Sequence, residues 1–368
     1  LRLHSDLEIY LAKGAVLQGT TNIHDYSPRI PSRFEGTEMR CYSSLLNAGD
    51  MNHKTGPNCR NIIIRGRGTI CGGGQELARK IIEDERARIK SFLDDNRDLV
   101  ESCENSDTIP GRVRPRLINL SNCENVWISG ITLKNGPSWN VHMIYCDDIQ
   151  TDHCTFVSEG VWNGDGWDPD SSTNCTLFAS EFSTGDDAVA IKSGKNPEGN
   201  EINRPCAHIR VFDCRSDCGH GICIGSEMSG GVEDVQIWDC DLANSLSGIE
   251  IKATPKRGGY VRGVTVRDCI TPRVMLHSVP YNDDGLPAGA PPKLEHCFFE
   301  RLTLTAEVQD HDRSRHDAAP IEIAGFDKPG YEVEDIVFKD ITITKPSVAL
   351  PLGLCKGVTL SNLACVKE

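Results

Sequence analysis

The chain has 368 residues, with 25% charged residues and a formal net charge of −14. A nucleic-acid partner would need a basic face for its phosphates, so we expect none. No stretch approaches the roughly 20 apolar residues of a membrane span, so we expect no membrane partner either. The charge also disfavours a strongly polyanionic substrate, unless cations gather inside the site.

The chain begins at Leu1, in a segment that resembles a strand and carries no signal-peptide pattern. We expect a truncated N-terminus, which leaves the location open. The protein would be secreted or periplasmic if a signal has been removed. A cytoplasmic bacterial enzyme is also compatible with the many cysteines that read as free thiols.

Nine segments share apolar or small residues at relative positions 0, +2, +5 and +7, and weaker copies occur at Leu7-Ile9 and Ile62-Ile64. A gap of two keeps side chains on one face of a strand, while the step of three requires a bend between two strands. Such coils cannot bury their apolar side alone and must stack. The sequence therefore predicts an all-β fold, a parallel β-helix (solenoid) that forms a single domain over residues 1–368. The nine segments start at Val126, Ile149, Cys175, Ile209, Val235, Val264, Cys297, Ile336 and Val358.

Many of the 17 cysteines fall on these repeated positions. Cys175 and Cys297 occupy position 0, and four others occupy position +5. We expect small buried hydrophobes with free thiols, with one or two loop disulfides as the alternative. Cys214 and Cys218 alone make a poor metal site, and we expect no metal and no cofactor. The four cysteines at position +5 are Cys154, Cys214, Cys240 and Cys269.

Three excursions interrupt the repeats. Residues 75–104 are highly charged with apolar residues at helical spacing, which predicts a helical insertion. This insertion either packs on the solenoid as a solvated helix or forms a wall of a substrate groove. Residues 280–292 are rich in Gly, Pro and Asp and predict an irregular loop, and residues 311–317 predict a charged, exposed segment.

A second parallel sheet is predicted from the strands around 141–143, 189–191, 222–224 and 249–251, with one more coil near 162–168. Polar residues gather on and beside these strands. Asp187 and His220 each stand two residues before an apolar strand, so we expect them one coil apart. Asp165 should lie one coil away on the other side, beside Asp186.

Crowded carboxylates cannot all stay ionised, so at least one should have a raised pKa. Glycoside hydrolysis needs one carboxyl that protonates the leaving oxygen and another that activates water or attacks carbon. We therefore predict a catalytic group formed by Asp165, Asp186, Asp187 and His220.

This stretch resembles glycoside hydrolase family 28, the polygalacturonases, and in particular their bacterial, exo-type branch. The hallmark motifs of that family are N-T-D-G, G-D-D, G-H-G and R-I-K. The resemblance covers about residues 7 to 345 and implies a right-handed β-helix. The corresponding segments here are Asn163-Gly164-Asp165-Gly166, Gly185-Asp186-Asp187, Gly219-His220-Gly221 and Glu250-Ile251-Lys252.

The resemblance also implies roles within an inverting single displacement. Asp186 would be the general acid, while Asp165 and Asp187 would hold and deprotonate the attacking water. His220 would tune the proton of the acid and contact substrate. Lys252 would bind a sugar substituent. Further candidate substrate contacts are Glu250, Lys192, Tyr281, His142 and Trp167.

Two positions depart from the motifs: Gly164 replaces Thr, and Glu250 replaces the Arg that would receive a galacturonate carboxylate. Either Glu250 pairs with Lys252 or Arg257 and accepts hydroxyls of a neutral sugar, or another cation replaces the Arg. The candidate cations are Lys192, Lys256 and Arg257. We expect the protein to hydrolyse pectic, galacturonate-containing glycan and to release its products from a chain end. We also expect its leaving-group subsite to be altered.

Two other functions remain open. A polysaccharide lyase on the same solenoid would need a calcium cage or an Arg or Lys base beside the sheet. A non-catalytic glycan-binding solenoid would keep its function without an acid. The partner is a carbohydrate in each case, and the oligomeric state stays unknown.

Overall fold

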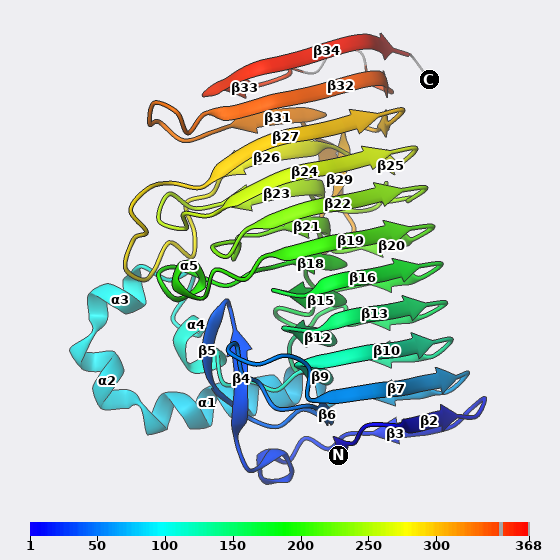
Figure 1. Cartoon of the computed structure of the whole chain (residues 1–368), viewed down its shortest axis with the longest axis vertical. Coiled ribbons are helices and arrows are strands. Elements are labelled where there is room, and N and C mark those ends of the chain that lie inside the picture. The colour runs from blue at the N-terminus through cyan, green and yellow to red at the C-terminus, as the bar shows by residue number, and fades with distance from the viewer. Residues whose placement is uncertain (346–348, 367–368) are drawn as a thin grey trace.

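The computed structural model describes residues 1–345 and 349–366. Parallel strands stack coil upon coil along the long axis, so that the two termini lie at opposite ends (Figure 1). This right-handed parallel β-helix confirms the predicted fold class.

One long sheet has eleven strands, and its outer face carries the site described below. In spatial order these are β1 (Arg2–Leu3), β6 (Leu46–Ala48), β9 (Ile118–Ser121), β12 (Val141–Ile144), β15 (Trp167–Asp170), β18 (Val189–Ile191), β21 (Gly221–Ile224), β23 (Gly248–Ala253), β26 (Val274–Ser278), β31 (Ile321–Ala324) and β33 (Leu352–Gly353).

The second long sheet has thirteen strands, twelve of them on its main path, and the thirteenth, β34, pairs with β32 beside it. Its members are β2 (Leu7–Leu11), β7 (Cys59–Gly66), β10 (Cys123–Ser129), β13 (Asp147–Asp152), β16 (Thr173–Phe178), β19 (Cys206–Phe212), β22 (Val232–Trp238), β24 (Tyr260–Arg267), β27 (Lys293–Glu300), β32 (Val333–Ile343), β28 (Thr303–Leu304), β25 (Ile270–Thr271) and β34 (Cys355–Cys365). A short third sheet contains β3 (Val16–Gln18), β8 (Thr69–Cys71), β11 (Thr132–Lys134), β14 (Thr155–Val157), β17 (Glu181–Ser183) and β20 (Arg215–Cys218).

The strand register confirms the predicted repeats. Val126 pairs with Ile149, which pairs with Cys175, and the series continues through all nine starting positions to Val358. The weaker copies align as well, since Leu7 pairs with Ile62 and Ile62 pairs with Val126.

The step of three in the repeat corresponds to a bend with left-handed backbone. The residue at position +4 has a positive φ in every one of the nine coils. Asn, Asp and Gly tolerate this conformation best, and Asp or Asn occupies it in five coils. The bend turns the chain from the thirteen-stranded sheet into the next short strand. These residues are Gly130, His153, Ala179, Asp213, Asp239, Asp268, Arg301, Asp340 and Asn362.

The interior is one continuous hydrophobic cluster that runs along the stack. Identical side chains stack between neighbouring coils. The ring centroids of Phe156 and Phe182 are 4.6 Å apart, and those of Phe299 and Phe338 are 4.7 Å apart. All seventeen cysteines lie in the described residues as free thiols, and thirteen are buried. The expectation of buried thiols is thus confirmed, and the alternative of loop disulfides is wrong.

Helices gather beside the early coils (Figure 1). The predicted insertion, residues 75–104, is helical and comprises α1 (Gly74–Arg88), α2 (Lys90–Asp95) and α3 (Arg97–Glu101), and α4 (Thr108–Gly111) follows it. Further short helices are η1 (Ile23–Tyr26) and α5 (Glu198–Ile202). No helix of the described residues is both long and apolar enough to cross a membrane.

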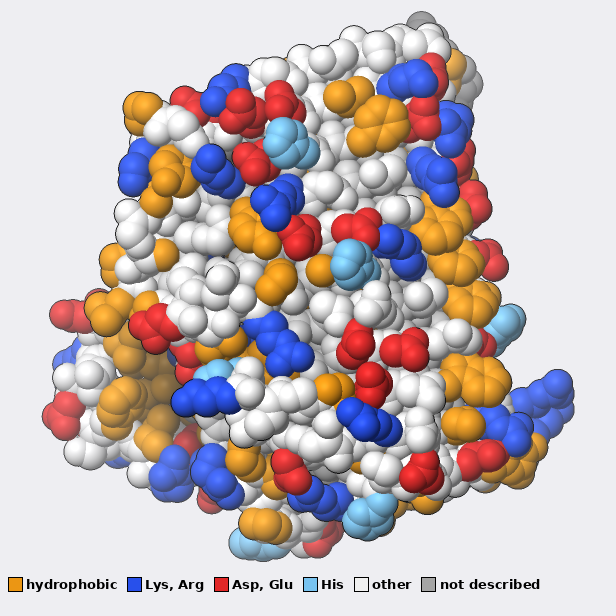
Figure 2. Space-filling model, viewed as in Figure 1, with side chains coloured by type: hydrophobic (Ala, Val, Ile, Leu, Met, Phe, Trp, Pro, Cys, Tyr) orange, Lys and Arg blue, Asp and Glu red, His pale blue; other side chains and the backbone are white. Residues whose placement is uncertain are grey.

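Two antiparallel hairpins have no counterpart in the repeat pattern: β4 (Ile30–Phe34) with β5 (Thr37–Cys41), and β29 (Glu307–Gln309) with β30 (Arg315–Asp317). The second hairpin contains the predicted charged segment 311–317, which is exposed. The predicted irregular loop 280–292 contains no strand or helix. On the face shown in Figure 2, acidic and basic side chains are interspersed, so no single-sign patch dominates it.

Candidate active site

A cavity of ≈ 300 Å³ opens on the outer face of the eleven-stranded sheet, where β15, β18, β21 and β23 follow one another. Its floor comes from these strands and the turns before them, and its walls come from the excursions. Its lining residues are Glu35, Glu104, Trp139, Asn163, Asp165, Asp186, Asp187, Lys192, His220, Gly225, Ser226, Glu227, Leu246, Ser247, Glu250, Lys252, Tyr281 and Asn282.

The four predicted catalytic residues all line this cavity. Val189 pairs with Ile222, so Asp187 and His220, each two residues earlier, stand one coil apart as expected. Trp167 pairs with Val189, which puts Asp165 in the equivalent position of the preceding coil. The parallel register therefore brings together residues that are far apart in sequence.

His220 connects two carboxylates. Its Nδ1 lies 2.9 Å from Asp186 Oδ1 and 3.0 Å from Asp187 Oδ1. Burial disfavours the imidazolium, but the two carboxylates outweigh it and raise the pKa of His220 to about 10. Reciprocally, although burial would raise it, His220 lowers the pKa of Asp186 below its usual range. His220 therefore holds a proton between two ionised carboxylates.

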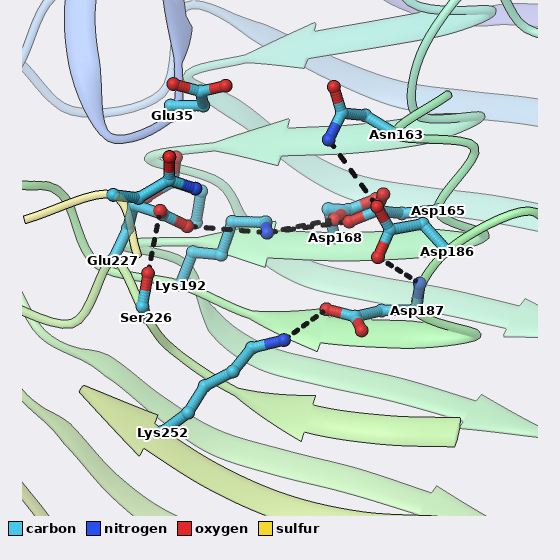
Figure 3. A network of polar contacts seen from close by, with 12 residues as sticks. Glu35, Asn163, Asp165, Asp168, Asp186, Asp187, Lys192, Ser226, Glu227 and Lys252 are labelled. Atoms are coloured by element: carbon cyan, nitrogen blue, oxygen red, sulfur yellow. Dashed lines mark hydrogen bonds and ion pairs between the residues drawn. The ribbon is translucent and has the colours of Figure 1, made fainter. Parts of the chain in front are cut away.

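A second contact orients Asp186. Asn163 Nδ2 donates to Asp186 Oδ2 at 3.4 Å (Figure 3). Arg114 donates to Asn163 Oδ1 at 2.6 Å. The backbone N–H of Asp187 donates to Asp186 Oδ1 at 2.9 Å. The carboxyl of Asp186 is thus positioned on both of its oxygens.

Lys192 lies among acidic groups on the other side of the carboxylates. Its Nζ is 3.5 Å from Asp165, 3.6 Å from Glu227 and 3.8 Å from Asp168 (Figure 3). Burial, together with the neighbouring Asp charges, raises the pKa of Asp165 well above its usual range. Burial likewise raises the pKa of Asp168 to about 8. The prediction that at least one carboxyl of the group has a raised pKa is confirmed at these two residues, with burial as the first cause, and the pKa of Asp186 is not raised.

Lys252 lies between two ionised carboxylates. Its Nζ is 3.5 Å from Asp187 Oδ2 and 3.6 Å from Glu250 Oε2. Burial disfavours the charged carboxylates, but Lys252 lowers the pKa of Asp187 and, with His277, brings that of Glu250 to about 2. Of the two readings of Glu250, pairing with Lys252 therefore holds.

Arg257 and Lys256 do not replace the missing Arg. Arg257 is fully buried and donates to Ser226, Asn196 and Asn282, and it does not line the cavity. Lys256 contacts Asp283 and also lies outside the lining. Among the described residues, the cations that line the cavity are Lys192, Lys252 and His220.

Two predicted substrate contacts are wrong. His142 is fully buried, 3.2 Å from Asp170 and 3.4 Å from Arg116, because the β4–β5 hairpin covers this part of the sheet. Trp167 points into the core, where its Nε1 donates to Thr151, because an inward position of β15 alternates with the outward ones. Tyr281, by contrast, lines the cavity as expected.

Several lining residues were missed. Glu35 comes from the turn of the β4–β5 hairpin, and Glu104 from the helical insertion, so this insertion contributes to a wall. Trp139 forms a side of the cavity, with Lys192 Nζ 4.7 Å above its ring. Glu227 follows a Gly-Ser turn after β21, and only that turn signal marked the region.

One wall is held by a charged network between the excursions. Arg112, after α4, donates to Glu35 at 2.8 Å and to Asp284 of loop 280–292 at 2.9 Å. Lys195, in the loop after β18, also contacts Asp284. All four side chains are largely buried, so the network ties four separate segments together at this end of the cavity.

Asp186, Asp187 and His220 offer ligand atoms within 4.8 Å of one another, close enough to share one cation. The same atoms already contact one another through the His220 proton, and a cation would have to displace it. The expectation of no metal and no cofactor stays a prediction.

The chain is similar to known proteins over most of its length. The family model of glycosyl hydrolases family 28 matches residues 33–279. A probable polygalacturonase of Vitis vinifera is 42% identical over 157 residues, covering 42% of this chain and 32% of that protein. An exo-poly-alpha-D-galacturonosidase of Dickeya chrysanthemi is 24% identical, covering 99% of this chain and 64% of that protein. This chain thus spans about a third to two thirds of the length of these relatives.

The solved structure of an exopolygalacturonase from Thermotoga maritima superposes with a TM-score of 0.78 and 22% identity. The match covers 100% of this chain and 81% of that one, and it supports the β-helix fold.

Proposed function

This chain belongs to glycosyl hydrolases family 28, and we propose that it is an inverting, exo-acting hydrolase of galacturonate-containing pectic glycan. The observation that carries the proposal is one cavity in which Asp165, Asp186 and Asp187 meet His220. An acid and a base in one carbohydrate-sized site are what glycoside hydrolysis requires.

In the proposed reaction Asp186 delivers the proton to the glycosidic oxygen. The Asp186–His220 pair holds that proton below a pH of about 10, because the two groups share it. As the proton reaches the leaving oxygen, the bond between that oxygen and the anomeric carbon breaks, and the leaving sugar departs as a neutral alcohol.

Water enters from the opposite face of the sugar ring. Asp165 and Asp187 hold it, and Asp187 accepts its proton while its oxygen bonds to the anomeric carbon, which inverts the configuration. Asp187 is the ionised member of the two because its pKa is lowered, so it is the base, whereas Asp165, whose pKa is raised, positions the water.

The exo mode rests on the cavity walls. Glu35, Glu104 and Tyr281 come from the β4–β5 hairpin, the helical insertion and loop 280–292, and Arg112 ties the hairpin to this loop. A wall at one end leaves room for a chain terminus and obstructs a continuous polymer. The Dickeya chrysanthemi relative is named an exo-enzyme, which agrees with this mode.

The leaving-group subsite is altered in our proposal. Glu250 occupies the position of the Arg in the R-I-K motif, and its carboxylate is held ionised at the cavity surface. A uronate carboxylate placed there would meet a like charge.

The test is hydrolysis of pectic oligosaccharides followed by proton NMR of the first products. We expect β-anomers from α-linked substrates and release of one sugar or a short unit from the non-reducing end, with strongly reduced activity in Asp186→Asn. Retained configuration would contradict inversion, and random-length products would contradict the exo mode. An unsaturated product absorbing in the ultraviolet would indicate a lyase, and binding without turnover a glycan-binding protein.

A further inference from the structure

Glu250 is fixed by two neighbouring coils. Its Oε1 lies 2.7 Å from Nε2 of His277 on β26, and its Oε2 accepts from Cys223 of β21 at 3.5 Å. Behind His277, Glu322 of β31 lies 3.8 Å from Nδ1. The carboxylate of Glu250 is therefore held at the cavity surface rather than left free to turn away from a ligand.

The ammonium of Lys252, which lies beside Glu250, is already paired with negative charge. Lys252 has ionised carboxylates at 3.5 Å and 3.6 Å, and only 10% of its side chain is exposed. A third carboxylate, from substrate, would give this ammonium three anionic neighbours. This end of the cavity can therefore bind sugar hydroxyls, which donate to Glu250, far better than a uronate carboxylate.

The surroundings of Lys192 differ in one respect. Its Nζ has three carboxyl groups within 3.8 Å and its side chain is only 5% exposed, but the ring of Trp139 lies 4.7 Å from it. This ring adds an apolar face on which a sugar can stack.

We propose that the enzyme cleaves bonds between a galacturonate and a neutral leaving sugar that is held on the Glu250 side, and that Glu250 and His277 determine this specificity. The proposal rests on the proposed hydrolase function, and it names the substrate class of the same site. In this arrangement Glu250 accepts hydroxyls of the leaving sugar, and His277 positions Glu250.

The test compares two disaccharides: galacturonate α-linked to a neutral hexose or 6-deoxyhexose, and digalacturonate. We expect kcat/KM to favour the neutral leaving sugar by roughly tenfold or more, because removal of a like-charge contact is worth that much. Glu250→Gln should move the ratio about tenfold towards digalacturonate, mostly through KM. His277→Asn should move it in the same direction by less, because Glu250 then loses its support.

Glu295→Gln on β27 is the matched control, since it removes the same charge from the other long sheet. It should leave the ratio unchanged. If the unmodified enzyme prefers digalacturonate, the specificity proposal is wrong while the hydrolase function stands. An unchanged ratio in both site variants, with melting temperatures like that of the unmodified protein, would also overturn it. Failure to cleave either disaccharide would overturn the proposed function itself.

Discussion

His220 Nδ1 lies 2.9 Å from Asp186 Oδ1, and the two side chains come from neighbouring coils that are 34 residues apart. Because Asp187 Oδ1 is only 3.0 Å away, one imidazolium serves two carboxylates. The proton that the proposed reaction needs therefore belongs to a cluster rather than to one residue.

Removing the acid should stop turnover without unfolding the protein. Asp186→Asn keeps the oxygen that accepts from the Asp187 N–H, but it cannot deliver a proton. We expect kcat to fall by about 10²–10⁴-fold, the usual contribution of general acid catalysis, with a small change in melting temperature. Asp148→Asn is the control, because it makes the same change at an exposed position with a positive φ that Asn tolerates. Turnover in Asp186→Asn close to that of Asp148→Asn would reassign the acid.

The His220 proton should also appear in the pH dependence of stability. The folded pKa of about 10 exceeds the ordinary value of 6.5, so the imidazolium stabilises the folded state fully below pH 6.5. That stabilisation is lost as the pH rises through about 10. The difference in free energy of unfolding between the unmodified protein and His220→Asn should therefore be largest near pH 6 and shrink towards pH 10. Urea unfolding at several pH values measures it, and a difference that grows with pH would contradict the assignment.

The repeat and the catalytic group could be predicted from sequence for the same physical reason. Interior positions recur in every coil, and parallel register converts that recurrence into neighbours one coil apart. Asp187 and His220 stand at equal offsets from Val189 and Ile222, and the pairing of those two strand residues puts them together. The periodicity of the apolar residues alone therefore predicts that Asp187 and His220 are neighbours.

Residues outside the periodicity could not be placed in this way. The β4–β5 hairpin has no repeat pattern, yet it buries His142 by covering the sheet: its Arg33 reaches Asp170 at 2.8 Å, and Phe34 stacks on Trp139 at 4.8 Å. The same hairpin brings Glu35 to the cavity from more than a hundred residues away in sequence. Whether the side chain of Trp167 points into the core or outward depends on which residue begins β15. Strand boundaries are poorly determined by local sequence.

The cysteines should behave as buried thiols. Burial raises the pKa of Cys154 and of Cys297 to about 12, so little thiolate is available at neutral pH. Titration with a thiol reagent should detect few cysteines in the native protein and seventeen after denaturation without reductant. Excess reductant should leave the melting temperature unchanged. Fewer than seventeen thiols in the unreduced, denatured protein would indicate disulfides.

The wall of the cavity can be opened by one substitution. Arg112 joins Glu35 and Asp284, so Arg112→Met leaves the largely buried Glu35 without its partner and Asp284 with Lys195 alone. Breaking a buried ion pair by removing one member typically costs about 3–5 kcal/mol, and part of this cost can be relieved if loop 280–292 moves away. We expect a lower melting temperature and, on long pectic chains, a larger share of internal cleavage, seen as longer products in the first minutes of reaction. Arg60→Met, which breaks an exposed pair with Glu124 on the thirteen-stranded sheet, is the matched control and should leave the product lengths unchanged. If Arg112→Met loses stability while still releasing only terminal units, the network holds the fold together but does not enforce the exo mode.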